Sequence, residues 1–281
     1  MVASFPATVA LAVSCGTAIA LGVVLLMTVK PDLAESVAMV VVAVTAGLLH
    51  GIGYAKRPSR HTTLGRHRKT GGFMKILVLG ATGGVGQEIV RQGLEHGHEI
   101  KAFVRARGRL EAFDGRITVV EGDLLNGSQL ERVIVGQDVV ASGFGPRVPV
   151  SKSDSHLLQR FASALTSAML YAGVKRVIAV SVAFLFKDSI IPPAYLAGRL
   201  FFPDLVADAS EMEHVFANSG LDWTIVRPPR LTGKPRKGAY RAREDHLPRF
   251  GFTISRADVA DFMLLCAENH VSSRKIVGVS N

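Results

Sequence analysis

Three glycines spaced three residues apart, Gly80, Gly83 and Gly86, constrain the fold of this chain more than any other feature. They follow the short apolar run Lys75–Leu79, which is typical of a buried parallel strand, and they open an amphipathic helical pattern. This spacing allows a tight turn, a close approach of backbone to a pyrophosphate, and close helix-on-strand packing. The strand–turn–helix context therefore predicts a dinucleotide-binding loop rather than a glycine-rich turn without a ligand. The residues of this loop that we expect to contact the cofactor are Gly80, Thr82, Gly83, Gly84, Val85 and Gly86.

The next predicted strand, His98–Val104, ends at Arg105, and Arg107 and Arg109 follow it. Proteins that prefer NAD usually place an acidic residue at this point, where it binds the ribose 2′-hydroxyl. An arginine instead suits a 2′-phosphate, because its planar guanidinium offers several donors at once. Arg105 therefore predicts NADP(H) as the cofactor. For Arg107 and Arg109 a solvated loop is an equally simple interpretation.

Strands and helices continue to alternate along the chain. Further strands are predicted at Arg116–Val120, Asp138–Ala141 and Arg176–Val180, and a long helix at Ser153–Ala172. Strict alternation of this kind predicts an α/β fold, a doubly wound parallel sheet of the Rossmann type, over residues 74–281.

Three further residues lie where the carboxyl ends of the predicted strands would meet the cofactor. Asp123 is expected to reach the adenine amino group, and Leu124 to lie beside the adenine ring. Gly143, in the loop after the fourth strand, is expected near the nicotinamide ribose.

The first 73 residues differ in character from the rest. Two apolar runs, Phe5–Val29 and Ser36–Ala55, are each long enough to cross a bilayer as a helix. Residues 1–55 are therefore predicted to form a membrane hairpin of two transmembrane helices, and residues 56–73 a basic linker that leaves the Rossmann domain on the cytoplasmic side. A cleaved signal peptide, a buried helical pair, and a translation start at Met74, which would make the protein cytoplasmic and soluble, are the alternatives.

Charge and cysteine content exclude several classes of protein. The net charge is +10, but seven of the 33 basic residues fall in the first 73 positions, against two of the 23 acidic ones. The remaining domain is only mildly basic and lacks a basic stripe with interleaved aromatic residues, so no nucleic-acid partner is expected. Cys15 and Cys266 cannot form a disulfide framework, and neither has neighbours at metal-ligand spacing, so no metal site is predicted.

Three segments carry a family resemblance. The run Met74–Gly86, the stretch Ser219–Arg230 and the stretch Ile254–Phe262 resemble atypical short-chain dehydrogenase/reductases, in particular the NAD(P)H-binding, NmrA-like group that includes biliverdin-IXβ (flavin) reductase. The resemblance covers residues 74–281 and not the first 73. It implies a Rossmann fold that binds NADP(H), with a small-molecule substrate held over the nicotinamide by the C-terminal third.

The resemblance also bears on catalysis. Short-chain dehydrogenases commonly use a serine together with Tyr-x-x-x-Lys, in which the lysine lowers the pKa of the tyrosine. Here Ser181 ends the fifth predicted strand, and Tyr195 precedes Arg199 at the lysine position. Ser181 and Tyr195 are the candidate catalytic residues. The alternatives are a turn-capping role for Ser181 and a packing role for Tyr195 in an apolar lid, Ala183–Val206.

Two functions of different class follow. The first is an NADPH-dependent oxidoreductase that reduces a flat conjugated acceptor of the flavin, quinone or tetrapyrrole class. The second is a non-catalytic NADP(H)-binding redox sensor or assembly factor at the membrane, which the departure from Tyr-x-x-x-Lys favours. A sugar-nucleotide epimerase or dehydratase ranks last, because it needs the tyrosine base.

Overall fold

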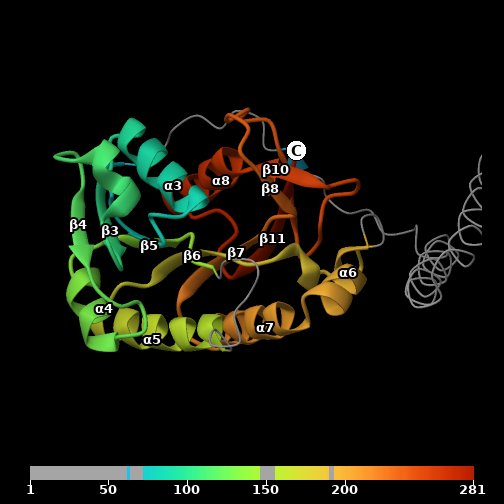
Figure 1. Ribbon diagram of the computed structural model, residues 1–281, viewed down its shortest axis with the longest axis horizontal. Coiled ribbons are helices and arrows are strands. Elements are labelled where there is room, and N and C mark those ends of the chain that lie inside the picture. Colours follow the sequence, from blue (N-terminus) through green and yellow to red (C-terminus); the bar gives the residue numbers. More distant parts are fainter. Residues whose placement is uncertain (1–61, 64–71, 146–155, 190–192) are drawn as a thin grey trace, which may run out of the picture. The chain divides into compact units, whose positions relative to one another are not determined.

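The computed structural model describes residues 62–63, 72–145, 156–189 and 193–281 (Figure 1). All of them belong to one compact unit, Arg60–Asn281. The predicted membrane hairpin, residues 1–55, lies outside the described residues. Within the described ranges, no helix combines the length and the apolar character that crossing a bilayer requires.

The centre of the domain is a nine-stranded sheet in the order β1-β9-β11-β7-β6-β5-β2-β3-β4. From β11 to β4 all neighbouring strands are parallel. The strands are β1 (Thr62–Thr63), β2 (Lys75–Leu79), β3 (Glu99–Val104), β4 (Thr118–Glu121), β5 (Val139–Ser142), β6 (Arg176–Val180), β7 (Asp222–Arg227), β9 (Arg241–Glu244) and β11 (Lys275–Ser280). The predicted doubly wound parallel sheet of the Rossmann type is confirmed.

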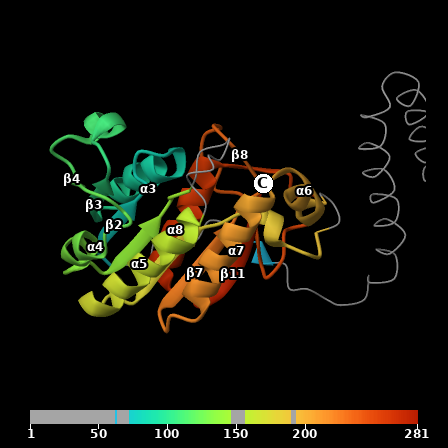
Figure 2. The same ribbon diagram turned by 60° about the horizontal axis from the view of Figure 1, so that its bottom comes forward.

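Helices cover both faces of the sheet (Figures 1 and 2). On one face lie α3 (Gly84–Glu95) and α8 (Arg256–Asn269), and on the other α4 (Gly127–Ile134), α5 (Leu157–Ala172) and α7 (Pro203–Ala217). Each layer has its own apolar core. The shorter elements are η2 (Gly108–Phe113), η4 (Ala183–Leu185), α6 (Ala194–Phe201) and a small parallel pair, β8 (Arg230–Thr232) with β10 (Thr253–Ser255).

The strand order reverses between β2 and β5. From β2 the chain moves outward through β3 to β4, and it then returns to place β5 on the other side of β2. The connections that leave β2 and β5 therefore go to opposite faces of the sheet. Doubly wound folds bind ligands beyond the carboxyl ends of the strands at such a reversal.

Two features of the sheet differ from the prediction. Strand β9 runs antiparallel to β11, and β1, which lies within the predicted linker, runs antiparallel to β9. The sequence did not indicate either strand, because both are short and lie in polar, basic segments. The basic stretch from Arg227 to Arg243 contains β8 and part of β9.

Strand β3 begins one residue later than predicted, for a local reason. Helix α3 ends at Glu95, and the chain turns at Gly97, whose φ of +83° suits glycine, so that the amide of His98 donates to the carbonyl of Gly93. This turn uses the His98 amide before the sheet begins at Glu99, whose amide donates to Met74 at 2.9 Å.

Candidate functional site

The glycine loop after β2 folds as a tight turn against the first turn of α3. Gly80 has a φ of +71°, and the amide of Gly83 donates to its carbonyl at 2.9 Å. A Cβ atom at Gly86 would lie only 2.1 Å from the same carbonyl oxygen. A side chain at Gly86 would therefore push helix and turn apart, so glycine is required where the helix crosses the strand end.

The loop after β5 packs directly on this turn. The amide of Gly143 donates to the Leu79 carbonyl at 3.0 Å, and a Cβ atom at Gly80 would lie 2.7 Å from the Phe144 amide nitrogen. The ring of Phe144 in turn lies 4.7 Å from that of Phe161, centroid to centroid. The structure thus brings Gly143 beside the glycine loop at the point where the strand order reverses.

The N-terminus of α3 is open to an anion. Its N-cap, Gly83, has no side chain that could accept from the first amides, and the first turn holds no acidic residue. Gly84 is exposed, Thr82 is half-buried and Val85 is buried. Free amides at the positive end of a helix are suited to phosphate groups, so this turn fits the pyrophosphate of a dinucleotide.

An arginine that the sequence analysis did not identify lies over the same turn. A Cβ atom at Gly84 would lie 2.5 Å from Cδ and 2.8 Å from Nε of Arg256, the first residue of α8. The buried carboxylate of Asp258 holds this end of α8, since it accepts from the amides of Lys237 and Gly238 and from Ser255. Arg256 lies within the stretch Ile254–Phe262. That stretch carries the family resemblance, but its sequence alone does not indicate that the arginine faces the glycine turn.

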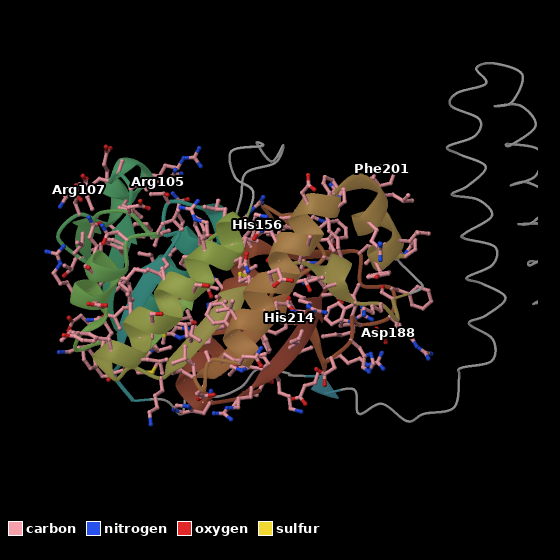
Figure 3. All side chains as sticks on the ribbon, turned by 90° about the horizontal axis from the view of Figure 1, so that it is seen from below. Arg105, Arg107, His156, Asp188, Phe201 and His214 are labelled. Atoms are coloured by element: carbon pink, nitrogen blue, oxygen red, sulfur yellow. The ribbon has the colours of Figure 1, made fainter. Side chains whose placement is uncertain are left out.

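Arg105 follows β3 and is exposed at the edge formed by the carboxyl ends of the strands (Figure 3). Its neighbour Arg107 interacts locally: its amide donates to Glu121, and its guanidinium lies 4.0 Å from Asp114. Arg107 therefore fits the solvated loop interpretation, and Arg105 stays the candidate for a 2′-phosphate.

The two residues expected at the adenine have different surroundings. Asp123 is exposed, and its carboxylate accepts from the Leu125 amide at 3.0 Å, which shapes the turn into α4. Leu124 is buried in the core beneath α4 and α5. Much of its side chain is thus already covered by protein. The assignment of both residues to the adenine stays a prediction.

Ser181 is part of a buried polar network. Its hydroxyl donates to Oε1 of Glu213 at 2.5 Å, and Glu213 also accepts two hydrogen bonds from Arg227. The guanidinium carbon of Arg227 lies 4.7 Å from the centre of the Phe186 ring. The proton of Ser181 is thus directed to a carboxylate. Sequence reasoning missed Glu213 and Arg227, because they lie on α7 and β7 and meet Ser181 only in the fold.

Tyr195 and Arg199 lie one turn apart on α6 and form a pair. The guanidinium donates to the phenol oxygen at 3.0 Å, and this hydrogen bond lowers the pKa of Tyr195. Helix α6 packs on the segment that follows Ser181, because Gly198 lies against the side chain of Phe184. The arrangement reproduces in outline the pairing of a tyrosine with a cation four residues later.

Two histidines, His156 and His214, lie apart from this site. His156 is an exposed N-cap of α5, and His214 is exposed on α7 (Figure 3). Cys266 is fully buried in α8, and burial raises the pKa of its thiol to about 12. Cys15 lies outside the described residues.

A family model described as NAD(P)H-binding matches residues 80–270, from the glycine loop to the end of α8. The chain belongs to the NAD(P)H-binding family. This confirms the resemblance to atypical short-chain dehydrogenase/reductases. The glycine loop, the open end of α3 and the adjacent Gly143 loop fit the dinucleotide that this family binds.

Individual relatives agree with this assignment. An uncharacterized chloroplastic protein of Arabidopsis thaliana is 30% identical over 217 residues, which cover 73% of this chain and 76% of that protein. A Bacillus subtilis protein named as an uncharacterized sugar epimerase is 31% identical over 199 residues, covering 66% and 85%. A short-chain dehydrogenase/reductase from Veillonella parvula, solved in complex with NADP, shares the fold with a TM-score of 0.62 at 22% identity, covering 75% of this chain and 95% of that chain.

Proposed function

We propose that this NAD(P)H-binding protein is an NADPH-dependent oxidoreductase that reduces a flat conjugated acceptor, such as a flavin, a quinone or a tetrapyrrole. The observation that carries the proposal is the glycine turn, with its open helix end, at the reversal of the strand order. When bound there, the dinucleotide supplies a hydride from its nicotinamide. The protein supplies orientation and excludes water.

The preference for NADP(H) rests on Arg105. It follows β3 at the position where a 2′-phosphate would lie, and it is exposed and available for a charged ligand. Arg256 lies against Gly84 at the start of α3, where it would meet the pyrophosphate. We therefore assign the 2′-phosphate to Arg105 and the pyrophosphate to Arg256. The family relationship alone supports only a nicotinamide cofactor.

The acceptor class rests on the segment after β6. Two aromatic rings, Phe184 and Phe202, stack at 5.5 Å with an angle of 15° between their planes, and Leu200 and Phe201 on α6 are exposed. Helix α6, which ends at Phe201, lies along the same edge of the domain as Arg105 (Figure 3). Its exposed apolar side chains suit the flat face of a conjugated ring system. Tyr195, with its lowered pKa, would be the nearest candidate proton donor of this helix.

The test is oxidation of NADPH by the purified full chain, followed by the loss of nicotinamide absorbance, with flavins, quinones and biliverdin as acceptors. NADH serves as the matched control. Turnover with at least one acceptor, faster with NADPH than with NADH, is expected. If saturating NADPH is bound but never oxidised with any acceptor of the panel, the oxidoreductase proposal fails.

A second candidate, a non-catalytic NADP(H)-binding sensor or assembly factor, is favoured by two observations. Arg199 stands where Tyr-x-x-x-Lys has lysine, and the Ser181 hydroxyl is directed to Glu213. A sensor must bind NADP⁺ and NADPH with different affinities or respond differently to them. Equal affinities combined with turnover would exclude this candidate, and unequal affinities without turnover would favour it over the oxidoreductase.

Attachment to a membrane through residues 1–55 is part of the same proposal, and it rests on the two apolar runs alone. The described residues do not include them. Cell fractionation of the full chain and of a variant that begins at Met74 tests the point. The full chain is expected in the membrane pellet and the shorter one in the supernatant. Recovery of both in the supernatant would contradict membrane attachment.

A further inference from the structure

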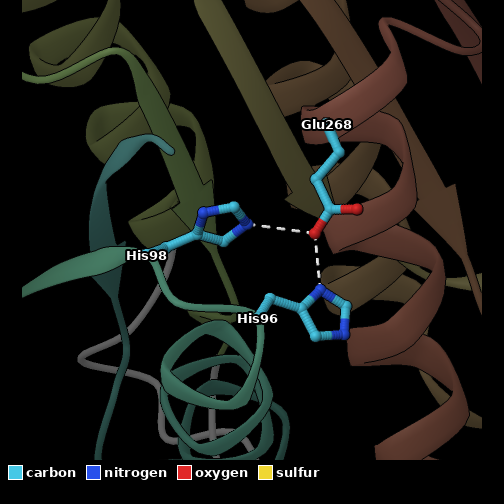
Figure 4. A group of neighbouring side chains, drawn as sticks. All are labelled: His96, His98 and Glu268. Carbon is cyan, nitrogen blue, oxygen red and sulfur yellow. Dashed lines mark hydrogen bonds and ion pairs between the residues drawn. The ribbon is translucent and has the colours of Figure 1, made fainter. Parts of the chain in front are cut away.

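A cluster of two imidazoles and one carboxylate lies where α3 ends, beside α8 (Figure 4). His96 caps the end of α3, His98 precedes β3, and Glu268 belongs to the last turn of α8. Nδ1 of His96 lies 2.5 Å and Nε2 of His98 lies 3.0 Å from the same oxygen, Oε1 of Glu268. One ligand atom from each residue lies within 4.8 Å of the other two.

The position of the cluster makes it independent of the cofactor. The glycine turn opens α3, whereas His96 lies just beyond its other end, about 18 Å away for a helix of this length. The backbone holds both histidines firmly, because the turn at Gly97 fixes His96 and His98 on either side of it. The three side chains therefore join the ends of three separate elements.

The buried charge of this cluster needs a cation. The side chains of Glu268 and His98 are 6% and 2% exposed, and that of His96 is 15% exposed. Both imidazoles direct a ring nitrogen at the same carboxylate oxygen. Among the described residues, the ion-pair partners of this carboxylate are these two histidines, without a lysine or arginine. A buried carboxylate with only neutral imidazoles around it would be a costly uncompensated charge.

The contacts of His98 place its ring toward the other two residues. It meets the carboxylate through Nε2 at 3.0 Å, while its other ring nitrogen, Nδ1, is buried without a hydrogen-bond partner in the described part of the chain. The ring is therefore positioned by Nε2, the atom that faces Oε1 of Glu268. A metal cation bound by all three residues would meet the same three atoms that now contact one another.

We propose that His96, His98 and Glu268 form a zinc site that fastens α8 to the junction between α3 and β3. Two imidazoles and one carboxylate are a common ligand set for zinc. Tetrahedral zinc with bonds of about 2.0–2.1 Å keeps its ligand atoms roughly 3.3 Å apart. The nitrogen–oxygen separations of 2.5 and 3.0 Å would need to open by less than 1 Å, roughly, on that geometry. A water would complete the tetrahedron as the fourth ligand, as in zinc sites with three protein ligands.

The experiment uses the full chain without a polyhistidine tag, titrated with zinc sulfate by calorimetry after treatment with a chelator. The variants are H98Q and E268Q, and H214Q, an exposed histidine on α7, is the matched control. One zinc ion per chain should bind and raise the melting temperature, and the affinity should fall at least about tenfold in H98Q and E268Q but not in H214Q.

Two further measurements keep the test decisive if a core variant folds poorly. Cobalt(II) should give a tetrahedral ligand-field spectrum with the wild-type chain and with H214Q, and lose it in H96Q, which alters the most exposed of the three ligands. Equal metal uptake by all variants would show that the metal binds at another site, and it would overturn the proposal. Absence of zinc binding in a wild-type chain that still binds NADPH would also overturn the proposal.

Discussion

The hydroxyl of Ser181 donates to Oε1 of Glu213, and the same oxygen accepts from Nε of Arg227 at 2.9 Å. The carboxylate therefore connects the carboxyl ends of β6 and β7 with α7, at the same edge of the sheet as the glycine turn. The serine at the end of β6 is held by a buried ion pair. A substrate that hydrogen-bonds Ser181 would meet its oxygen lone pairs, because its proton is directed inward.

This network gives the first prediction. E213Q keeps the shape of the side chain but leaves the buried charge of Arg227 without its counter-ion. The free energy of unfolding should fall by about 3–5 kcal/mol, measured by urea denaturation. E211Q, which alters an exposed carboxylate on the same helix, should change it by less than about 0.5 kcal/mol. Equal effects of the two variants would argue against a buried ion pair.

The glycine turn gives a second prediction. G86A places a Cβ atom against the Gly80 carbonyl, so it should destabilise the fold by about 1–3 kcal/mol and weaken NADPH binding at least about tenfold. G127A is the control, because Gly127 opens α4 and a Cβ atom there meets nothing within 4 Å. That variant should bind NADPH normally. Unaltered binding in G86A would show that the turn does not hold the cofactor.

Arg105 and Arg256 are assigned to different phosphates, and their variants should therefore differ. R105A removes a charged donor from the 2′-phosphate alone. Its dissociation constant for NADPH should rise about 10–100-fold, while that for NADH stays within about threefold. R109A, in the neighbouring loop, should keep the preference for NADPH. A parallel loss for both cofactors in R105A would move this arginine away from the 2′-phosphate.

R256A should behave in the opposite way. Arg256 lies over the turn that fits the pyrophosphate, which NADPH and NADH share, so both dissociation constants should rise by about tenfold. R256K, which keeps the charge, should recover part of the affinity. If R256A changes only the ratio of the two affinities, or neither of them, the pyrophosphate assignment is wrong.

Asp258, which anchors the helix that carries Arg256, predicts a dependence of stability on pH. Burial disfavours its charged form, but hydrogen bonds from Gly238, Asn281, Ser255 and Lys237 outweigh this and lower the pKa of Asp258 below its usual value. A lowered pKa in the folded state means that the ionised group stabilises the fold above the unfolded pKa. This contribution is lost as the pH falls through the folded pKa.

The unfolding free energies of wild type and D258N should thus differ most near neutral pH. The difference should shrink between roughly pH 5 and pH 3 as the wild-type carboxyl takes up its proton. Urea denaturation at a series of pH values measures it. D114N, at an exposed position, is the control and should stay close to wild type throughout. A difference that grows toward low pH would contradict the direction of the pKa shift.

The parts of this protein that were predictable from sequence are those with local signals. The strand Lys75–Leu79 and the glycine turn lie within a dozen residues, so one short motif indicates both. The other buried parallel strands show the same short apolar pattern and can be recognised by it. The pattern therefore predicted the Rossmann sheet and the place of Gly80, Gly86 and Arg105. It also predicted β6 with its observed ends.

The contacts that sequence reasoning missed join residues far apart in the chain. Ser181 and Glu213 are 32 residues apart, and His98 and Glu268 are 170 apart. No spacing rule relates such pairs, because the sheet order alone decides that they meet. The antiparallel strand β9 was missed for another reason, since its sequence, Arg-Ala-Arg-Glu, lacks the apolar pattern of a buried strand.

The most direct test of the central claim is a titration of the full chain with NADPH, followed by the fluorescence of the bound nicotinamide, with NADH in a parallel titration. The account predicts saturable binding of one NADPH per chain, with an affinity at least about tenfold higher than that for NADH. Equal affinities would remove Arg105 from the 2′-phosphate. Failure of both cofactors to bind a folded chain would contradict the assignment of the glycine turn as the dinucleotide site.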